Sequence, residues 1–336
     1  MSNAKKVLVI GVGSIGERHL RCFQVTGRVQ LSICDVDAVL RAQVAQAQGI
    51  NRVYASVDEA LADRPDAAVI TTPAHLHVSM AIKLAEAGVH LLIEKPLGTG
   101  LEGLDRLVTV VNQRRLVAAV AYVHRANPIL QAMRAAIASG RFGPPVQLVI
   151  TAGQHFPTYR PAYRTIYYRD RNTGGGAIQD ALTHLVNTAE WLVGPADRVL
   201  ADAAHQVLEG VDVEDTVHLL TRHGPVMASF ALNQYQAPNE TTITVVCRGG
   251  TARYEAHLSR WRWMINPEEP WHDECVEPLE RDALFVRQAE SFLDAIEGRV
   301  APLCSLAEGI QTLRVNLAAL ASCQTACWQT IERGCS

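Results

Sequence analysis

The sequence lacks the features that would tie the protein to a nucleic acid, a membrane or a metal ion. Its 31 basic and 34 acidic residues give a net charge of −3, so no cationic excess is present to attract a polyanion. The longest apolar stretches, such as residues 116–123, fall far short of the roughly 20 residues that a membrane span needs, and no signal peptide is visible. The eight cysteines form no Cys-x-x-Cys pair, so we expect no metal site and reduced thiols in a cytoplasmic protein.

The first third of the chain has the pattern of a parallel sheet. A chain of 336 residues is too long for one hydrophobic core, because domains typically hold about 100 to 200 residues. Short apolar runs alternate here with helical patterns, which is typical of parallel strands covered by helices on both faces. We therefore expect an α/β protein whose residues 1–123 form a Rossmann domain with a doubly wound parallel sheet. Its strands are expected at residues 7–10, 29–34, 67–71, 90–94 and 116–122.

Residues 124–336 show a different pattern, which predicts an α+β domain with a mostly antiparallel open sheet. Asn127 followed by Pro128 is a typical helix start. Turn residues at 223–225 and 248–250 separate pairs of strand-like runs, so these strands should form hairpins. We assign substrate binding and oligomerisation to this domain. Further helices are expected near residues 177–192, 282–297 and 306–328, the last after a capping box of Ser305 and Glu308.

A glycine-rich turn, Gly11-Val12-Gly13-Ser14-Ile15-Gly16, lies between the first expected strand and a helix. Gly11 makes the tight turn, Gly13 lets the backbone approach a diphosphate, and Gly16 lets helix and strand pack closely. Ser14 and Ile15 begin the helix, whose positive end meets the phosphates. The turn predicts a dinucleotide cofactor.

Asp35 ends the second expected strand. A carboxylate at this place accepts hydrogen bonds from the adenosine ribose hydroxyls and repels the 2'-phosphate of NADP. We therefore expect NAD as the cofactor. NADP is kept as an alternative, because Arg41 lies close by in the sequence and offers a cation for that phosphate.

Several different short motifs occur along nearly the whole chain in a definite order. They are Thr72-Pro73 with His77, Glu94-Lys95-Pro96, Tyr122 with Arg125, Asn127 and Pro128, and Gly174-Gly175-Gly176 with Asp180 and His184. In this order and spacing the chain resembles the Gfo/Idh/MocA family, which includes glucose-fructose oxidoreductase and inositol dehydrogenases. The resemblance implies that a cofactor site includes Thr72, Pro73, His77, Glu94 and Lys95.

The resemblance also implies catalytic roles for Lys95, Asp180 and His184. Lys95 would orient the substrate, and Asp180 and His184 would act on the reacting hydroxyl. Independently, the four-residue spacing of Asp180 and His184 puts them on one face of a helix, away from its apolar stripe. Hydride transfer from an alcohol needs a base for the hydroxyl proton. His184 suits this role near neutral pH, and a partly buried Lys95 is the alternative base.

The chain departs from the family pattern at two positions. Leu182 stands where members often have glycine, and Asn187 stands where they often have a further aspartate. Neither position belongs to the three catalytic residues, so we still expect activity.

An arm at residues 158–171 holds four tyrosines and four arginines. Arginine forks bind carboxylate or phosphate in a two-pronged way, and tyrosine rings offer flat faces to sugars. An acidic or phosphate-bearing sugar is therefore one hypothesis for the substrate. A subunit interface, where tyrosine and arginine are also enriched, is an equal alternative. Besides the catalytic residues, we expect the substrate to contact Tyr122, Arg125, Arg160, Tyr163 and Arg164.

The motifs together predict an NAD-dependent dehydrogenase that acts on a hydroxyl or ketone of a sugar, sugar acid, nucleotide sugar or cyclitol. An NAD-dependent glycosidase of the same superfamily is a second hypothesis. A non-catalytic NAD-binding regulator is a third, although such a protein would not need all three catalytic residues. We also expect a homodimer or homotetramer, because an open antiparallel sheet has one face to cover. No nucleic acid or membrane partner is expected.

Overall fold

The computed structural model describes residues 4–275, 279–280 and 282–332 of the chain. Contacts between Cα atoms divide the chain into two compact units. The first unit comprises the chain up to Ala126 together with Glu280–Ile310, and the second comprises Asn127–Leu279 together with the chain from Gln311 onward. Residues 280–310 thus belong to the first unit. A single division of the chain after residue 123 would place them in the second. The expected domain limits at residues 1 and 336 lie outside the described residues, and the roles expected of the two domains stay predictions.

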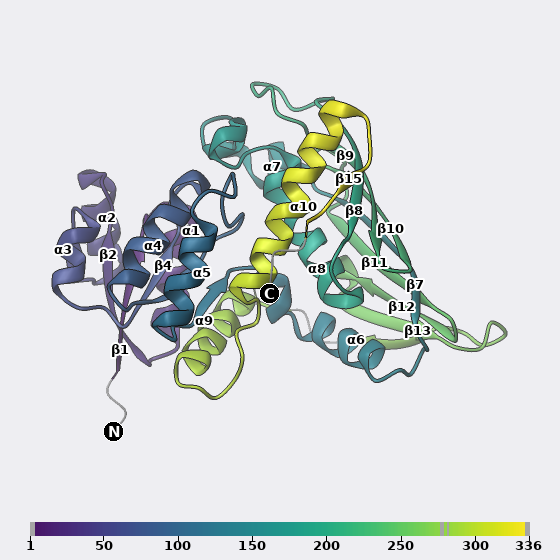
Figure 1. Cartoon of the computed structure of the whole chain (residues 1–336), viewed down its shortest axis with the longest axis horizontal. Coiled ribbons are helices and arrows are strands. Elements are labelled where there is room, and N and C mark those ends of the chain that lie inside the picture. Colours follow the sequence, from purple (N-terminus) through teal and green to yellow (C-terminus); the bar gives the residue numbers. More distant parts are fainter. Residues whose placement is uncertain (1–3, 276–278, 281, 333–336) are drawn as a thin grey trace. The chain divides into compact units, whose positions relative to one another are not determined.

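The first unit is built on a six-stranded parallel sheet (Figure 1). Its strand order is β3-β2-β1-β4-β5-β6, and every neighbouring pair is parallel. This confirms the predicted doubly wound sheet. The two-residue β3 was not expected, because so short a strand carries no alternation of apolar and polar residues. The strands are β1 (Lys5–Ile10), β2 (Val29–Cys34), β3 (Val53–Tyr54), β4 (Ala67–Ile70), β5 (His90–Ile93) and β6 (Ala118–Val120).

Helices bury both faces of this sheet, since the consecutive residues Val7, Leu8 and Val9 of β1 are all fully buried. Phe23 meets Phe292 edge to face, with ring centroids 6.3 Å apart. That contact joins the helix near residue 290 to the helix after the glycine turn. The helices of this unit are α1 (Ser14–Val25), α2 (Ala38–Gln48), α3 (Val57–Ala62), α4 (His77–Glu86), α5 (Leu104–Gln113) and α9 (Ala283–Ile296).

The second unit is built on a nine-stranded mixed sheet of order β14-β13-β12-β11-β7-β10-β9-β8-β15. The two expected hairpins, β9–β10 and β11–β12, are present and antiparallel. The central pair β7–β10 is parallel, which hairpin signals cannot reveal because the two strands are far apart in the sequence. The strands are β7 (Pro145–Gly153), β8 (Arg198–Ala204), β9 (Thr216–His223), β10 (Val226–Asn233), β11 (Glu240–Cys247), β12 (Gly250–Glu255), β13 (Arg260–Met264), β14 (His272–Cys275) and β15 (Gln329–Thr330).

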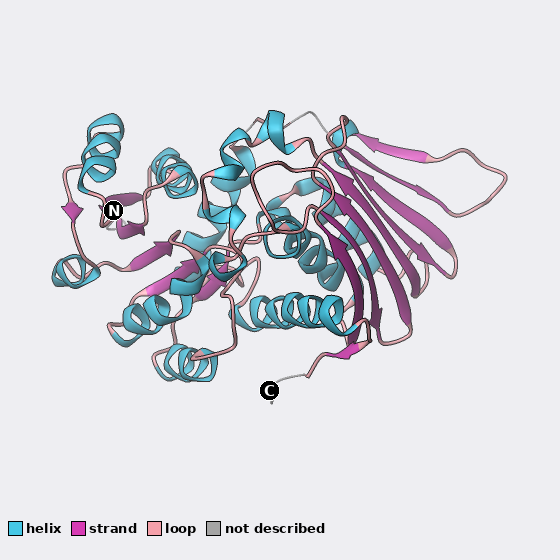
Figure 2. Cartoon of the chain, turned by 90° about the horizontal axis from the view of Figure 1, so that it is seen from above, coloured by secondary structure: helices cyan, strands magenta, loops and turns pink. Residues whose placement is uncertain are grey.

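Within the described residues, helices cover only one face of this second sheet (Figure 2). Leu148, Leu219 and Phe230 point from the strands into the core, where Leu185 and Val315 meet them from the helices. The opposite face carries no helix, as expected of an open sheet. The covering helices are α6 (Pro128–Ala138), α8 (Thr183–Val193) and the later part of α10 (Leu306–Thr325), and a short helix α7 (Phe156–Tyr159) lies in the arm.

Two expected helix starts are present with their caps. Asn127 accepts a hydrogen bond from the Ile129 N–H at 2.9 Å and so caps α6. At α10 the Glu308 N–H donates to Ser305 Oγ at 3.3 Å, and the Ser305 N–H donates to Glu308 Oε2 at 2.8 Å. This is the reciprocal capping box that the sequence predicts.

The helix expected at residues 177–192 is interrupted. Ile178–Leu182 forms a π-helical turn, and α8 begins only at Thr183. A π turn widens the helix by one residue per turn and is common at functional sites. The sequence pattern does not distinguish it from an α-helix.

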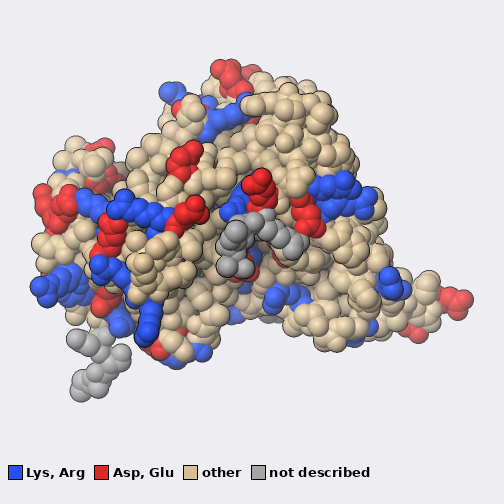
Figure 3. Space-filling model, in the orientation of Figure 1, with Lys and Arg blue, Asp and Glu red and all other residues tan. Residues whose placement is uncertain are grey.

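The described residues include no membrane-spanning helix and no cluster of metal-binding side chains. Basic and acidic side chains are intermixed on the face drawn in Figure 3. None of the helices in the described part is long and apolar enough to cross a membrane. Over the same residues no group of three or more His, Cys, Asp or Glu side chains is arranged to hold a metal ion.

Candidate active site

The glycine turn after β1 leaves space beside its backbone. Gly11 has φ +85°, and a Cβ on Gly16 would lie 1.9 Å from the Gly11 carbonyl oxygen. A Cβ on Gly13, in contrast, would meet nothing within 4 Å. The following helix α1 begins at Ser14 without a side-chain cap, so no side chain satisfies its first N–H groups. Open space in front of an uncapped helix start fits a bound diphosphate.

Asp35 follows β2 and contacts the glycine turn directly. Its Oδ2 accepts a hydrogen bond from the Val12 N–H at 2.7 Å, and its Oδ1 accepts one from the Asp37 N–H at 2.9 Å. Arg41 donates to the backbone carbonyl of Asp35. Asp35 therefore fixes the loop and places a carboxylate next to it, while the nearby arginine is hydrogen-bonded to the backbone.

The segment after β4 carries Thr72, Pro73 and, at the start of α4, His77. The buried Thr72 Oγ1 has no hydrogen-bond partner within the described residues, which is the situation of a polar atom awaiting a ligand or water. His77 is only 1% exposed. Its ring nitrogens lie 2.7 Å from the Thr72 carbonyl oxygen and 3.0 Å from the Pro96 carbonyl oxygen, and burial lowers its pKa. His77 thus contacts the backbone of two neighbouring loops and has almost no surface to offer a cofactor.

Lys95 follows β5. Its two neighbours, Glu94 and Pro96, both make contacts inside the first unit. The Lys95 N–H donates to Glu94 Oε2 at 3.0 Å, and Glu94 Oε1 lies 2.8 Å from His19 Nε2. Burial alone would raise the pKa of Glu94, but the hydrogen bond with His19 and the positive charge of Lys95 bring this pKa below its ordinary value. Glu94 is therefore an ionised carboxylate whose two oxygens are both hydrogen-bonded.

These groups share one edge of the parallel sheet. The glycine turn follows β1, Asp35 follows β2, Thr72 follows β4 and Lys95 follows β5. Because these strands are parallel neighbours, all four groups lie at their carboxyl ends. Ligands of doubly wound sheets bind at this edge.

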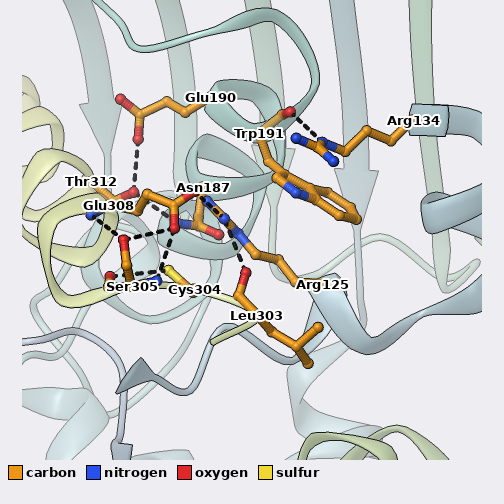
Figure 4. A network of polar contacts seen from close by, with 10 residues as sticks. All are labelled: Arg125, Arg134, Asn187, Glu190, Trp191, Leu303, Cys304, Ser305, Glu308 and Thr312. Atoms are coloured by element: carbon orange, nitrogen blue, oxygen red, sulfur yellow. Dashed lines mark hydrogen bonds and ion pairs between the residues drawn. The ribbon is translucent and has the colours of Figure 1, made fainter. Parts of the chain in front are cut away.

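Tyr122 and Arg125, which we expected to contact substrate, are 1% and 2% exposed. Figure 4 shows Arg125 donating to Glu308 and to the Leu303 carbonyl, the latter at 3.1 Å. These partners give Arg125 a structural role, because they join the segment before α10 and its first turn to the end of the first stretch of the same unit. Between the two residues lies His124, which sequence reasoning missed. Burial and the charge of Lys95 lower the pKa of His124 to about 4, so it is a neutral imidazole within the field of that lysine.

In the second unit a buried carboxylate fixes the turn before Asp180. Gly176 has φ +86°, and a Cβ there would lie 2.5 Å from Glu214 Oε1. Glu214 is 1% exposed, accepts a hydrogen bond from the Ile178 N–H at 3.1 Å and pairs with Arg171 at 2.8 Å. The positive φ of Gly176 and its close contact with Glu214, another residue that sequence reasoning missed, require a glycine at this position.

Asp180 lies in the π-helical turn and is 3% exposed. Tyr167 donates a hydrogen bond to its Oδ1 at 2.7 Å, and Arg160 Nη1 lies 3.9 Å from its Oδ2. His184, one turn further along, is half-buried. The π turn, the tyrosine and the arginine therefore determine where the Asp180 carboxylate lies.

The two departures from the family pattern are buried in the second unit. Leu182 is 1% exposed and belongs to the hydrophobic core. Asn187 is also 1% exposed and donates to Thr312 at 3.0 Å, and Thr312 donates to Glu190 at 2.7 Å (Figure 4). At both positions this chain uses the side chain for internal packing.

The arm divides the expected substrate contacts into two groups. Tyr163 is buried and donates to the Glu209 carbonyl, and Arg164 pairs with the Glu209 carboxylate at 3.3 Å. These two side chains are thus directed to a neighbouring loop. Arg160 is exposed and lies near Asp180. Tyr167 is the tyrosine of the arm that donates to Asp180. No sequence signal separates it from Tyr163, because the arm consists of turns too short to show a periodicity.

Models of known families match most of the chain. A model described as an oxidoreductase family with an NAD-binding Rossmann fold matches residues 5–122, and a model of the GFO/IDH/MocA C-terminal domain matches residues 130–253. The chain is 29% identical to the UDP-N-acetylglucosamine 3-dehydrogenase of Acidithiobacillus ferrooxidans, over 93% of this chain and 94% of that protein.

Solved structures of dehydrogenases also match the chain over nearly its whole length. The WlbA dehydrogenase of Bordetella pertussis, in complex with NADH and UDP-GlcNAcA, superposes with a TM-score of 0.85 at 26% identity, covering 99% of each chain. A levoglucosan dehydrogenase in complex with NADH superposes with a TM-score of 0.90, covering 98% of this chain and 99% of that one. At 20% identity the second match shows the fold alone.

Proposed function

Because the chain belongs to the GFO/IDH/MocA family of oxidoreductases with an NAD-binding Rossmann fold, we propose that it transfers hydride between NAD and a hydroxyl or ketone carbon of a sugar, sugar acid, nucleotide sugar or cyclitol. The observation that carries this proposal is the shared carboxyl edge of β1, β2, β4 and β5. The glycine turn, Asp35, Thr72 and Lys95 all lie there. An edge with cofactor-binding groups and a lysine is suited to redox chemistry on a small molecule.

The residues present fit NAD. The open space beside Gly13 and the uncapped start of α1 suit the diphosphate, and Asp35 suits the ribose. The unpartnered Thr72 Oγ1 offers a hydrogen bond to the cofactor. Ser14, Ile15 and Pro73 complete the cofactor-binding set that we propose. The Asp35 carboxylate would repel the 2'-phosphate of NADP, so NAD should be used at lower KM than NADP.

Bound NAD supplies a hydride acceptor at C4 of its nicotinamide. In our proposal the Lys95 ammonium binds the substrate oxygen and stabilises negative charge as it develops there. His184 accepts the hydroxyl proton, and Asp180 orients the substrate. Lys95 remains the alternative base. His124 is too weak a base to compete at neutral pH, because its pKa is about 4.

A panel of sugars and cyclitols, followed by the absorbance of reduced nicotinamide, tests this function. We expect net formation of NADH with at least one substrate, and a loss of about 10²- to 10⁴-fold in kcat/KM for Lys95→Ala. Lys83→Ala is the matched control, since Lys83 pairs with Asp58 on the surface. Turnover of a glycoside without net NADH would instead indicate the glycosidase, and NADH binding without any turnover would indicate a regulator.

We propose that Arg160 of the arm binds an anionic group of the substrate. Arg164 and Arg171 are already paired with Glu209 and Glu214, whereas Arg160 is exposed and 3.9 Å from Asp180. A carboxylate or phosphate on the substrate would pair with Arg160. Arg160→Ala should raise the KM of an anionic sugar by about 10-fold and leave that of a neutral sugar unchanged. Arg164→Ala is the control, and equal effects of both variants would favour an interface role for the arm.

We also propose a homodimer or homotetramer formed through the uncovered face of the second sheet. On this face Leu220 and Met227 are 45% and 52% exposed. Val149 and Leu220 are among the residues that line a hollow of about 560 Å³. Light scattering after gel filtration should give a multiple of the monomer mass. Leu220→Glu should lower the mass, whereas Val25→Glu on α1 should not.

A cytoplasmic location completes the proposal. Eight cysteines without a pairing pattern suit a reducing compartment, and NAD-dependent metabolism takes place there. Cell fractionation of the tagged protein tests it, and recovery in an extracytoplasmic fraction would contradict it.

A further inference from the structure

His19 lies inside the first unit and links two motifs that are 75 residues apart in the sequence. It belongs to α1, the helix that begins at the glycine turn, and is 1% exposed. Its Nε2 lies 2.8 Å from Glu94 Oε1. Its ring also meets Phe285 of α9 edge to face, with centroids 5.4 Å apart. The imidazole is therefore packed on one side and hydrogen-bonded on the other.

The hydrogen-bond geometry assigns a direction to this contact. The pKa of Glu94 is below its ordinary value, so Glu94 is a carboxylate and can only accept hydrogen bonds. The Nε2–H of His19 must therefore donate to it. The second carboxylate oxygen accepts from the Lys95 N–H at 3.0 Å. One side chain, Glu94, thus joins the ring of His19 to the backbone of Lys95.

The backbone next to Lys95 is hydrogen-bonded on its other side as well. The carbonyl oxygen of Pro96 lies 3.0 Å from Nδ1 of His77. With Glu94 at the N–H of residue 95 and His77 at the carbonyl of residue 96, the peptide units around Lys95 have fixed orientations. The direction in which the Lys95 side chain leaves the backbone follows from those orientations.

We propose that His19 is a positioning residue for Lys95, acting through the Glu94 carboxylate. Without the Nε2–H donor, a buried Glu94 loses the partner that orients it, and the Lys95 N–H loses a well-placed acceptor. The lysine would then occupy its productive position for a smaller fraction of the time. Since α1 also begins with the uncapped N–H groups that we propose bind the diphosphate, the same helix would place both the cofactor and the lysine. The proposal rests on the proposed catalytic role of Lys95.

Steady-state kinetics of two His19 variants test the proposal. His19→Leu fills the space without a donor and should lower kcat at least 10-fold while the KM for NAD changes less than 3-fold. His19→Gln restores an N–H donor and should recover a large part of kcat. His90→Leu is the matched control, because this histidine lies at the opposite end of β5, where its Nδ1 accepts from the Val117 N–H. It should alter the melting temperature but not kcat.

A second readout does not depend on turnover. The rate at which an amine-directed acylating reagent modifies Lys95 in the full-length protein, followed by mass spectrometry with and without NADH, reports the placement of the ammonium. His19→Leu should change the rate at Lys95 at least 3-fold and leave the rate at Lys83 unchanged. This result would support the link to Lys95 even if no sugar in the panel were oxidised, and so separates it from the proposed function.

Two results would overturn the proposal. One is a folded His19→Leu protein whose kcat and Lys95 acylation rate equal those of the wild type. The other is a loss of kcat that His19→Gln does not recover and that matches a fall in melting temperature, because that pattern marks packing alone.

Discussion

Buried contacts orient both Lys95 in the first unit and Asp180 in the second, and the ones described above act on different atoms. Around Lys95 they include two contacts to the backbone, since Glu94 accepts from its N–H and His77 meets the carbonyl of Pro96. At Asp180 the contacts are to the carboxylate itself, from Tyr167 at 2.7 Å and Arg160 at 3.9 Å. A backbone contact sets the direction in which a side chain begins. A contact to the carboxylate sets the position of the charged atoms.

The partners differ in kind as well. The side chains that support the backbone around Lys95 are the buried imidazoles of His19 and His77. Behind Asp180 stands a buried carboxylate, Glu214, with its partners Arg171 and the Ile178 N–H. The first arrangement depends on hydrogen bonds made by imidazole rings, and the second on hydrogen bonds and an ion pair accepted by a carboxylate. The two units should therefore respond differently to mutation and to pH.

The largest expected effect comes from removing the two fixed groups. Lys95→Met and Asp180→Asn should each lower kcat/KM by about 10²- to 10⁴-fold, because each removes a charge that acts on the reacting oxygen. Initial rates of NADH formation measure the loss, and Lys83→Met is the control for the first variant. A loss below 10-fold in either variant would remove that residue from the proposed catalytic set.

The second effect concerns stability in the second unit. Glu214→Ala leaves the Ile178 N–H without its acceptor and Arg171 without its buried partner, and should cost about 2–4 kcal/mol of unfolding free energy. Thermal unfolding by circular dichroism measures it. The control is Glu209→Ala, whose carboxylate is 86% exposed and pairs with Arg164; it should stay within about 0.5 kcal/mol of the wild type. Equal losses would mean that burial of Glu214 is not what stabilises the turn.

Local signals account for what the sequence predicts well. The parallel sheet, the glycine turn and the helix caps at Asn127 and Ser305 depend on residues close together in the chain. The parallel pairing of β7 with β10 depends on strands whose relative order no local pattern records. The two-residue β3 and the π turn at Ile178–Leu182 are too short to change a periodicity.

The same division applies to the candidate site. Lys95, Asp180 and His184 follow from motifs, and their roles stay predictions. His19, Tyr167 and Glu214 act through partners 13 to 75 residues away, so their importance emerges only with the structure. His19 lies on the buried side of α1 with Leu20 and Phe23, and nothing in the sequence distinguishes it from other residues that pack there. Tyr167 is one of four tyrosines in an arm built from short helical turns.

A smaller effect should follow from loosening Asp180 without removing it. Tyr167→Phe deletes one hydrogen bond to a carboxylate and should lower kcat/KM about 10-fold, because a bond to a charged group contributes about 1.5–3 kcal/mol. Tyr159→Phe is the matched control in the same arm, where Tyr159 is 52% exposed. Steady-state kinetics with the best substrate of the panel give the comparison. If the two variants behave alike, the contact between Tyr167 and Asp180 does not serve catalysis.

The smallest expected effect is a difference in acid sensitivity between the units. Burial lowers the pKa values of His77, His90 and His124 in the first unit, with His124 at about 4. In the unfolded chain a histidine titrates near pH 6.5. The unfolded chain therefore binds more protons once the pH falls below about 6.5, and the folded state loses stability from there downward. The lowered pKa values of Glu94 and Glu308 act only below their ordinary value of 4.5, so histidines dominate between pH 6.5 and 5.

Hydrogen exchange at pH 7 and pH 5, corrected for the intrinsic pH dependence, locates that loss. Peptides from α4, β5 and β6 should lose protection more than peptides from β9 and β10, although His223 in β9 also has a pKa lowered by burial. The melting temperature should fall by about 3 °C over the same range, and less in His124→Gln, which has no group to titrate there. An equal loss of protection in both units would show that the buried imidazoles do not set the acid response, and the contrast between Lys95 and Asp180 would then concern geometry alone.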